Sequence, residues 1–308
     1  MREFNLRMLD GKELHCYEWT AVTKPQAVLQ LVHGSAEHLR RYDKFAKHMN
    51  ENGIIVVGDD HRGHGYTADL SKKELGYFAN HHGWEKIVDD EKLVNDYIHK
   101  TWPTLPVFML GHSMGSFMVR TYAIKYSKTI QGLIIMGTAE NPRFLVDLGY
   151  FVALMHQIFK GAKTPDVSIW KQSYKPLNKK FRHLPDSNGQ EWLTRDLEVQ
   201  KAFAKDPLTK QVFTTSAFKD MFYGISYNQK KRNIKLMRED LPILIMSGTD
   251  DPVGNYGKYP QKVYNKFSKL NYPVEIKLYP DSRHEILNDL DYKEVEKDIV
   301  NFINQNLE

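Results

Sequence analysis

Residues Gly111 to Gly115 read GHSMG and place Ser113 at the centre of a GxSxG motif. An apolar run, 107–110, directly precedes the motif, and a segment with helical spacing follows it. Between a strand and a helix, this motif indicates a sharp turn that lifts the serine hydroxyl clear of a sheet. Glycine at both ends allows the strand and the helix to approach each other closely. We therefore expect an α/β sheet with a nucleophilic serine at the carboxyl end of a strand.

Short apolar runs of the kind that precedes this motif recur along the chain, and helical patterns separate them. They lie at 27–32, 54–57, 107–110, 133–136, 243–246 and 274–278. Runs of this kind are typical of strands in a parallel sheet. From about Thr138 to Asp240 helical pieces and turns replace them. We expect an α/β fold with a mostly parallel central sheet flanked by helices. Its core would comprise residues 1–138 and 241–308, with a helical cap inserted at 139–240.

The overall composition is that of a soluble globular protein, with 41% hydrophobic and 26% charged residues among 308. The longest apolar stretch, 144–159, contains Asp147 and His156 and is too short to span a bilayer. The first residues lack the apolar core of a signal peptide, and Cys16 is the single cysteine. These features predict a cytoplasmic protein without disulfides. The net charge of +5 is mild, and the one dense basic run, 230–232, has no nucleic-acid motif beside it, so no nucleic-acid partner is expected.

A serine nucleophile needs a general base and an acid that orients the base. Enzymes built on this type of turn carry their triad in the order serine, acid, histidine. His284 is the one histidine beyond the candidate acids Asp250 and Asp251. Pro252 rigidifies the loop next to Asp251 and favours that residue. Asp250 remains the alternative, and Glu140, after another predicted strand, is a more distant one.

The tetrahedral intermediate of such a reaction needs backbone donors. One is the amide of Met114, the residue after the nucleophile. The other is expected in the loop 33–38, which follows the predicted strand 27–32; there Gly34 permits a turn and the amide of Ser35 is the candidate. The alternative is an ordinary turn that merely ends the strand.

Several longer motifs match one group of enzymes. The segment 33–42 is similar to an HGxxEHxxRY signature, and 60–65 is similar to a DxRGHG turn. Further matches lie at 111–115, 192–196, 206–208, 248–252 and 282–285. From about residue 10 to the last helix, the chain resembles the monoacylglycerol lipase and lysophospholipase branch of the α/β hydrolases. Little in 141–190 matches this branch, so the resemblance leaves the acyl and head-group preference open.

The resemblance implies an α/β-hydrolase fold with Ser113, Asp251 and His284 as the catalytic triad. It also implies Ser35 and Met114 as oxyanion donors. The expected reaction is hydrolysis of a carboxylic ester through an acyl-enzyme on Ser113, with a single-chain lipid ester as substrate, namely a monoacylglycerol or a lysophospholipid. No metal or organic cofactor is needed.

Three alternatives to a lipid esterase remain at this point. The first is a carboxylesterase for short-chain or aromatic esters, and the second is a non-catalytic binding protein on the same fold. The third is a serine aminopeptidase, which would need an acidic group in the cap to hold the substrate's amine; Asp166, Asp186 and Glu191 are the residues to consider. The sequence does not specify the oligomeric state.

The stretch 144–159 has apolar residues at helical spacing. We interpret it as a lid helix whose inner face, with Phe144, Leu148, Phe151 and Met155, lines the acyl site. Its outer face would make transient contact with a membrane surface. The simpler interpretation is a cap helix that packs on its own small core.

Four histidines could suggest a metal site: His61, His64, His81 and His82. Their spacing matches no helix-borne pair of ligands, so we expect none. The segment 60–65 is instead interpreted as a turn that braces the edge of the sheet beneath the site.

Overall fold

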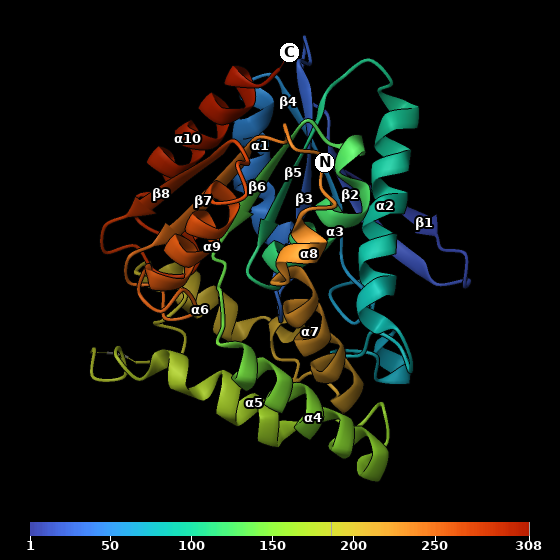
Figure 1. The fold of residues 1–308 in the computed structure, drawn as a ribbon, viewed down its shortest axis with the longest axis vertical. Coiled ribbons are helices and arrows are strands. Elements are labelled where there is room, and N and C mark those ends of the chain that lie inside the picture. Colours follow the sequence, from blue (N-terminus) through green and yellow to red (C-terminus); the bar gives the residue numbers. More distant parts are fainter. Residues whose placement is uncertain (186, 308) are drawn as a thin grey trace.

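The computed structural model describes residues 1–185 and 187–307. Its centre is an eight-stranded sheet in the order β1-β2-β4-β3-β5-β6-β7-β8 (Figure 1). The strands are β1 (Arg2–Arg7), β2 (Glu13–Trp19), β3 (Ala27–Val32), β4 (Ile54–Asp59), β5 (Val107–His112), β6 (Gly132–Met136), β7 (Ile243–Gly248) and β8 (Val274–Tyr279). β1 and β2 pair antiparallel with each other, β2 pairs antiparallel with β4, and all other pairs are parallel. The predicted, mostly parallel sheet is confirmed.

Helices cover both faces of this sheet because successive strand residues point to opposite sides. On one face, α1 (Asp43–Glu51) and α10 (Tyr292–Gln305) pack on residues such as Leu29 and Leu31. On the other face lie α2 (Gly83–Thr101), α3 (Met114–Tyr126) and α9 (Lys258–Ser268). Because β3 to β7 are fully buried, their sequences read as continuous apolar runs.

Of the helices between β6 and β7, all but the last, Lys231–Ile234, lie beyond the carboxyl ends of the strands (Figure 1). The helices between these two strands are α4 (Arg143–Lys160), α5 (Val167–Ser173), α6 (Leu197–Lys205), α7 (Thr215–Asn228) and α8 (Lys231–Ile234). α4 packs along α7, and α7 in turn packs on α3 and α2. This arrangement places a layer of helices over the edge of the sheet at which parallel α/β proteins build their sites.

No helix within the described parts of the chain combines the length and the apolar character needed to cross a membrane.

Candidate active site

Ser113 lies on a strained turn between β5 and α3. Its backbone has φ 54° and ψ −117°, a left-handed conformation that costs a non-glycine residue about 1–3 kcal/mol. The glycines on either side allow the close packing that this turn requires. A Cβ on Gly115 would lie 2.2 Å from the Val32 carbonyl oxygen, and one on Gly111 would lie 2.3 Å from the Gly115 carbonyl oxygen. The turn therefore holds the serine at the carboxyl edge of the sheet, as the motif predicts.

His284 and Asp251 meet at the ends of β8 and β7. The Nδ1 atom of His284 lies 3.0 Å from Oδ1 of Asp251, and both side chains are buried. The amide of Val253 also donates to Asp251 Oδ1, at 2.8 Å, which fixes the carboxylate. The Nε2 atom of His284 is buried and has no hydrogen-bond partner in the described part of the chain. With its proton on Nδ1, the imidazole presents Nε2 as an acceptor.

The other two candidate acids lie elsewhere. Asp250 is half-buried and forms an ion pair of 2.7 Å with Lys180. Glu140 forms ion pairs with Arg120 and Lys266. Of the three carboxylates considered from the sequence, the structure brings Asp251 alone to His284.

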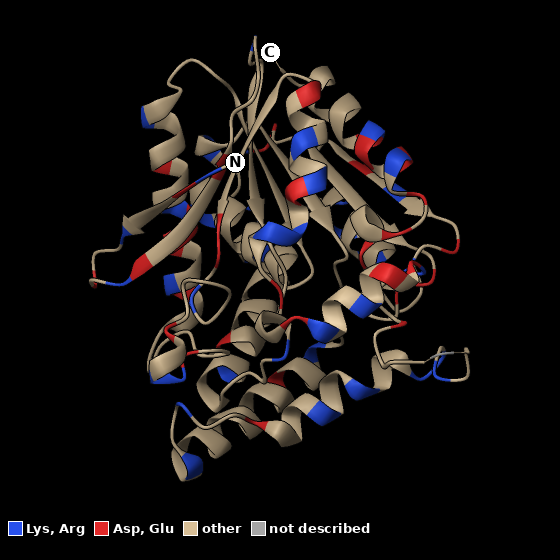
Figure 2. Ribbon diagram, turned by 180° about the vertical axis from the view of Figure 1, so that it is seen from behind, with Lys and Arg blue, Asp and Glu red and all other residues tan. Residues whose placement is uncertain are grey.

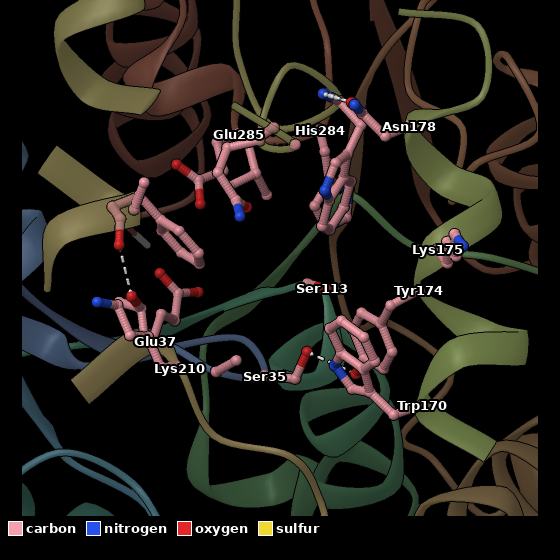
Figure 3. Close-up of a pocket in the computed structure, with 18 of the residues that line it drawn as sticks. Ser35, Glu37, Ser113, Trp170, Tyr174, Lys175, Asn178, Lys210, His284 and Glu285 are labelled. Carbon is pink, nitrogen blue, oxygen red and sulfur yellow. Dashed lines mark hydrogen bonds between the residues drawn. The ribbon is translucent and has the colours of Figure 1, made fainter. Parts of the chain in front are cut away.

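Ser113 and His284 line one cavity of about 1060 Å³ (Figure 3). No hydrogen bond joins the Ser113 hydroxyl to His284 Nε2 among the contacts of these two residues. Figure 3 shows Ser35, Ser113 and His284 around the same space, with Trp170 and Tyr174 on one side of it. Catalytic hydrogen bonds are often long before a substrate is bound, so this geometry is compatible with proton transfer between the two residues.

The two predicted oxyanion donors lie beside the serine. A Cβ on Gly34 would be 3.0 Å from the Ser113 Cβ, so the loop after β3 directly adjoins the nucleophile. In the part of the chain that the structure describes, neither the amide of Ser35 nor that of Met114 donates a hydrogen bond. Both therefore remain available to an oxyanion. The Ser35 hydroxyl is separately engaged, because it accepts a hydrogen bond of 2.9 Å from Tyr174.

A buried carboxylate, Glu37, holds the loop 33–38, which contains the candidate donor Ser35. Its Oε1 atom accepts hydrogen bonds from the Gly34 amide at 2.5 Å and from the Tyr42 hydroxyl at 3.0 Å. It also lies 3.1 Å from Nδ1 of His112, while Arg41 donates to Oε2 at 2.7 Å. Burial would raise the pKa of Glu37, but the hydrogen bond and charge of His112, together with Arg41, lower it well below its usual range. Glu37 is therefore an anion under the site.

The same buried network reaches the histidine loop. Nε2 of His112 donates to the main-chain carbonyl of His284 at 3.2 Å, so the neighbour of the nucleophile supports the candidate base. Arg41 donates to both carboxylate oxygens of Glu285, at 2.8 and 2.7 Å. Burial alone would lower the pKa of His112, but the hydrogen bond and charge of Glu37 raise it, which favours the cation. The HGxxEHxxRY spacing marks Glu37, Arg41 and Tyr42 in the sequence, but nothing in it identifies their distant partners.

A model of the family described as "Serine aminopeptidase, S33" matches residues 23–291. The chain belongs to this family. A protein of monkeypox virus named "Monoglyceride lipase homolog" is 26% identical over 95% of this chain and 93% of its own length. "Monoacylglycerol lipase" of Mycolicibacterium smegmatis is 26% identical over 92% and 90%. The crystal structure of a thermostable carboxyl esterase from Bacillus coagulans superimposes with a TM-score of 0.91 and 29% identity, covering 100% of this chain and 99% of that one. The predicted α/β-hydrolase fold, and the assignment to its monoacylglycerol lipase branch, are confirmed.

In this member of the S33 family, the cavity is lined by aromatic and apolar side chains from α5, α6 and the segment between them. They are Trp170, Tyr174, Pro176, Trp192, Leu193, Phe203 and Ala204. The indole of Trp192 lies against the His284 ring, with ring centroids 5.1 Å apart. Trp170, Tyr174 and Pro176 lie in 141–190, where little matches the branch, whereas Trp192 and Leu193 belong to the matching segment 192–196.

The prediction that the inner face of α4 lines the acyl site is wrong. Phe144, Leu148, Phe151 and Met155 do not line this cavity. The first three are 70%, 56% and 58% exposed on α4, and Met155 is half-buried. The reason is that α4 uses another stripe, which includes Val146 and Ala153, to pack on the core. Apolar residues surround most of the helix, so periodicity alone did not identify its inward face.

The turn 60–65 braces the sheet as predicted, but not at its edge, because β4 is an interior strand. Asp60 accepts hydrogen bonds from the amides of Leu39 and Tyr66 and from the hydroxyl of Tyr17.

A group of possible metal ligands lies beside this turn. Asp59, His61 and Glu91 are buried, and one ligand atom from each lies within 4.8 Å of the others. Nδ1 of His61 is 3.4 Å from Asp59 and 3.1 Å from Glu91, and its Nε2 donates to the His33 carbonyl at 3.0 Å. Both ring nitrogens are thus engaged within the protein. Burial would lower the pKa of His61, but the charge and hydrogen bond of Asp59 raise it well above its usual value, so these two side chains form a buried ion pair.

Proposed function

We propose that this chain hydrolyses carboxylic esters of single-chain lipids through an acyl-enzyme on Ser113. The observation that supports this most is the buried pair of Asp251 and His284. His284 has a free Nε2 and lines the same cavity as Ser113, which lies in the strained turn. The names of the relatives, monoacylglycerol lipases and a carboxyl esterase, support the same reaction class.

In the proposed mechanism, His284 Nε2 accepts the proton of the Ser113 hydroxyl while Oγ bonds to the ester carbonyl carbon. The oxyanion accepts hydrogen bonds from the amides of Ser35 and Met114. Asp251 stabilises the imidazolium that forms. His284 then gives its proton to the departing alcohol as the carbon–oxygen bond breaks, which leaves the acyl group on the serine.

Water completes the cycle. His284 takes a proton from the water, whose oxygen bonds to the acyl carbon, and returns the proton to Ser113 as the ester to the enzyme breaks. The products are a carboxylic acid and the free enzyme. Each step uses side chains or amides of this chain.

A lipid substrate is supported by the size and the lining of the cavity. Its volume of about 1060 Å³ is at the upper end of the range of ligand pockets. Its aromatic lining from α5 and α6 provides apolar surface for a long acyl chain. A short acyl group would leave most of this surface uncovered.

The aminopeptidase alternative has less support. Two carboxylates are found among the described residues that line the cavity, Glu37 and Glu285, and both are bound to Arg41. Asp166 caps α5 and pairs with His156, and Glu191 accepts hydrogen bonds from Asn178 and neighbouring amides. Asp186 lies outside the described residues. The described lining thus offers no unpaired anion to a substrate's amine.

The outer face of α4 supports a second part of the proposal, transient contact with a lipid surface. Phe144, Leu148, Phe151 and Phe159 are all exposed by more than half on this helix. Exposed aromatic and aliphatic side chains on one amphipathic helix favour binding at the membrane interface. Such contact would bring the cavity close to its substrate.

The proposed reaction is tested by hydrolysis of p-nitrophenyl esters with acyl chains from acetate to palmitate, with Ser113→Ala as the control. We expect the rate to peak at medium or long chains and to disappear in the variant. A peak at acetate or butyrate with the same dependence on Ser113 would favour a small-ester carboxylesterase. Activity that survives the substitution would contradict the mechanism.

A further inference from the structure

We infer that the mouth of the cavity is a binding site for an anionic, phosphate-bearing head group. The inference rests on the proposed function, and it narrows the single-chain ester to one with a phosphorylated glycerol. Five cationic side chains line the cavity, namely Lys171, Lys175, Lys179, Arg182 and Lys210. All five are exposed, whereas the aromatic residues of the same cavity are half-buried. The charges therefore stand at the opening and the apolar surface lies behind them.

Four of these five cations come from one segment of the chain. Lys171, Lys175 and Lys179 follow at intervals of four residues through α5 and the helical turns after it. These three lysines and Arg182 all line the same cavity, so this segment presents its cations to one opening. Figure 2 shows blue segments that recur along α5 and the turns that follow it. Lys210 comes from a separate segment, beyond α6, so the cavity opening receives cations from two parts of the chain.

None of these five cations forms an ion pair with a residue that the structure describes. Lys180, by contrast, does not line the cavity and forms an ion pair with Asp250. It also lies over the ring of Tyr256. The two carboxylates that line the cavity are paired with two cations, since Arg41 binds Glu37 and Glu285 and His112 lies 3.1 Å from Glu37. The opening therefore carries an uncompensated positive charge.

A phosphate monoester or diester fits this arrangement better than a neutral glycerol. Several ammonium groups and one guanidinium can each donate to its oxygens, and charge-assisted hydrogen bonds are stronger than neutral ones. The acyl chain of the same molecule would cover the aromatic lining, with the ester at Ser113. Hydrolysis by water would then release a fatty acid and a glycerol phosphate.

The test compares two esters with one octanoyl chain, 1-octanoyl-glycerol 3-phosphate and 1-octanoyl-glycerol, both kept below their micelle concentrations. The variant Lys175→Glu/Lys179→Glu reverses two charges at the opening. Lys128→Glu/Lys269→Glu is the matched control, since both lysines are exposed and lie in turns that precede β6 and β8, at the opposite edge of the sheet. Both double variants change the net charge equally.

For the wild-type protein we expect kcat/KM to be about tenfold higher for the phosphate ester, because each exposed charge pair contributes up to a few-fold. The preference should disappear in Lys175→Glu/Lys179→Glu, persist in the control and decrease with added sodium chloride. A preference for the neutral ester, or a phosphate preference that survives the charge reversal, would overturn the inference. Inhibition of neutral-ester hydrolysis by inorganic phosphate as strong as that by the phosphate-bearing lipid would also overturn it, because the site would then bind the free anion.

A binding measurement separates this inference from the proposed function. Calorimetry on Ser113→Ala uses the ether analogue 1-O-octyl-glycerol 3-phosphate and its neutral counterpart. Tighter binding of the phosphate form, weakened by the charge reversal at residues 175 and 179, supports the head-group site even if neither ester is hydrolysed. Equal binding of the two ethers overturns the inference whatever the hydrolytic activity.

Discussion

Arg41 and Glu285 form a two-point ion pair with distances of 2.8 and 2.7 Å, although 244 residues separate them in the sequence. Glu285 directly follows His284, and Arg41 also binds Glu37, which holds the loop of the predicted oxyanion donor Ser35. One guanidinium therefore connects two loops that approach the nucleophile from opposite ends of the chain. Glu285 is buried and the Arg41 side chain is only 11% exposed, so loss of the pair would affect both stability and geometry.

Arg41→Lys should lower both activity and stability, because an ammonium group cannot reproduce the two parallel hydrogen bonds. We expect kcat to fall roughly 10- to 100-fold with KM nearly unchanged. The free energy of unfolding should fall by about 1–3 kcal/mol. Steady-state kinetics and urea unfolding measure these effects. The control is Arg40→Lys, which alters an exposed ion pair with Glu3 and should change stability by less than about 0.5 kcal/mol. Equal effects of the two substitutions would refute a positioning role for Arg41.

Asp251→Asn should lower kcat by about 10⁴-fold, since an amide no longer fixes the tautomer of His284. Asp250→Asn should leave kcat within about twofold, because that carboxylate lies in an ion pair with Lys180 and not at the imidazole. Each variant replaces one carboxylate by an amide, at adjacent positions, so each is the control for the other. If Asp250→Asn instead abolished hydrolysis, the proposed triad would be incorrect.

Ser113→Gly should stabilise the protein by about 1 kcal/mol, whereas Ser113→Ala should not, although both remove the nucleophile. The reason is the backbone φ of 54°, which glycine adopts without strain and alanine does not. Differential scanning calorimetry of the two inactive variants measures the difference. Identical melting temperatures would show that the turn stores no strain at this position.

The contribution of Glu91 to stability should fall as the pH rises from about 5 to about 9. Burial, together with the charge of Asp59, raises the pKa of Glu91 from 4.5 to about 8. Because the folded-state pKa exceeds the unfolded one, the contribution is complete below about pH 4.5 and is lost as the pH rises through about 8. Glu91→Gln removes the titrating group and should flatten the dependence of Tm on pH. If Tm depended on pH as steeply in Glu91→Gln as in the wild-type protein, or more steeply, the pH dependence would come from other groups.

Leu148→Ser/Phe151→Ser should reduce hydrolysis of esters presented in vesicles several-fold, because the two exposed side chains supply apolar area for the interface. Hydrolysis of soluble p-nitrophenyl butyrate should stay unchanged, since neither residue lines the cavity. Vesicle co-sedimentation gives an independent readout. An equal loss on both substrates would indicate a structural role for this face of α4.

Much of the fold could be predicted from local sequence. The strands β3 to β7 are buried on both faces, so each appears as an apolar run of the expected length. The turn at Ser113 could be predicted because its strand, its glycines and its helix are adjacent in the chain. His284 could be predicted from chain order, since no other histidine follows the candidate acids.

The sequence by itself determined the features that depend on neighbouring residues: the sheet class, the serine turn and the order of the candidate catalytic groups. The sequence also favoured Asp251 over Asp250 through the adjacent Pro252. Tertiary structure alone turned α4 so that Phe144 and Phe151 face outward, and joined Arg41 to Glu285. These features depend on contacts between segments that are distant in the chain. No local pattern records which apolar stripe of a helix is covered, or which distant carboxylate a buried arginine meets. Packing of the whole molecule decides both, because burying one stripe or one charge is favourable only where a complementary partner is present.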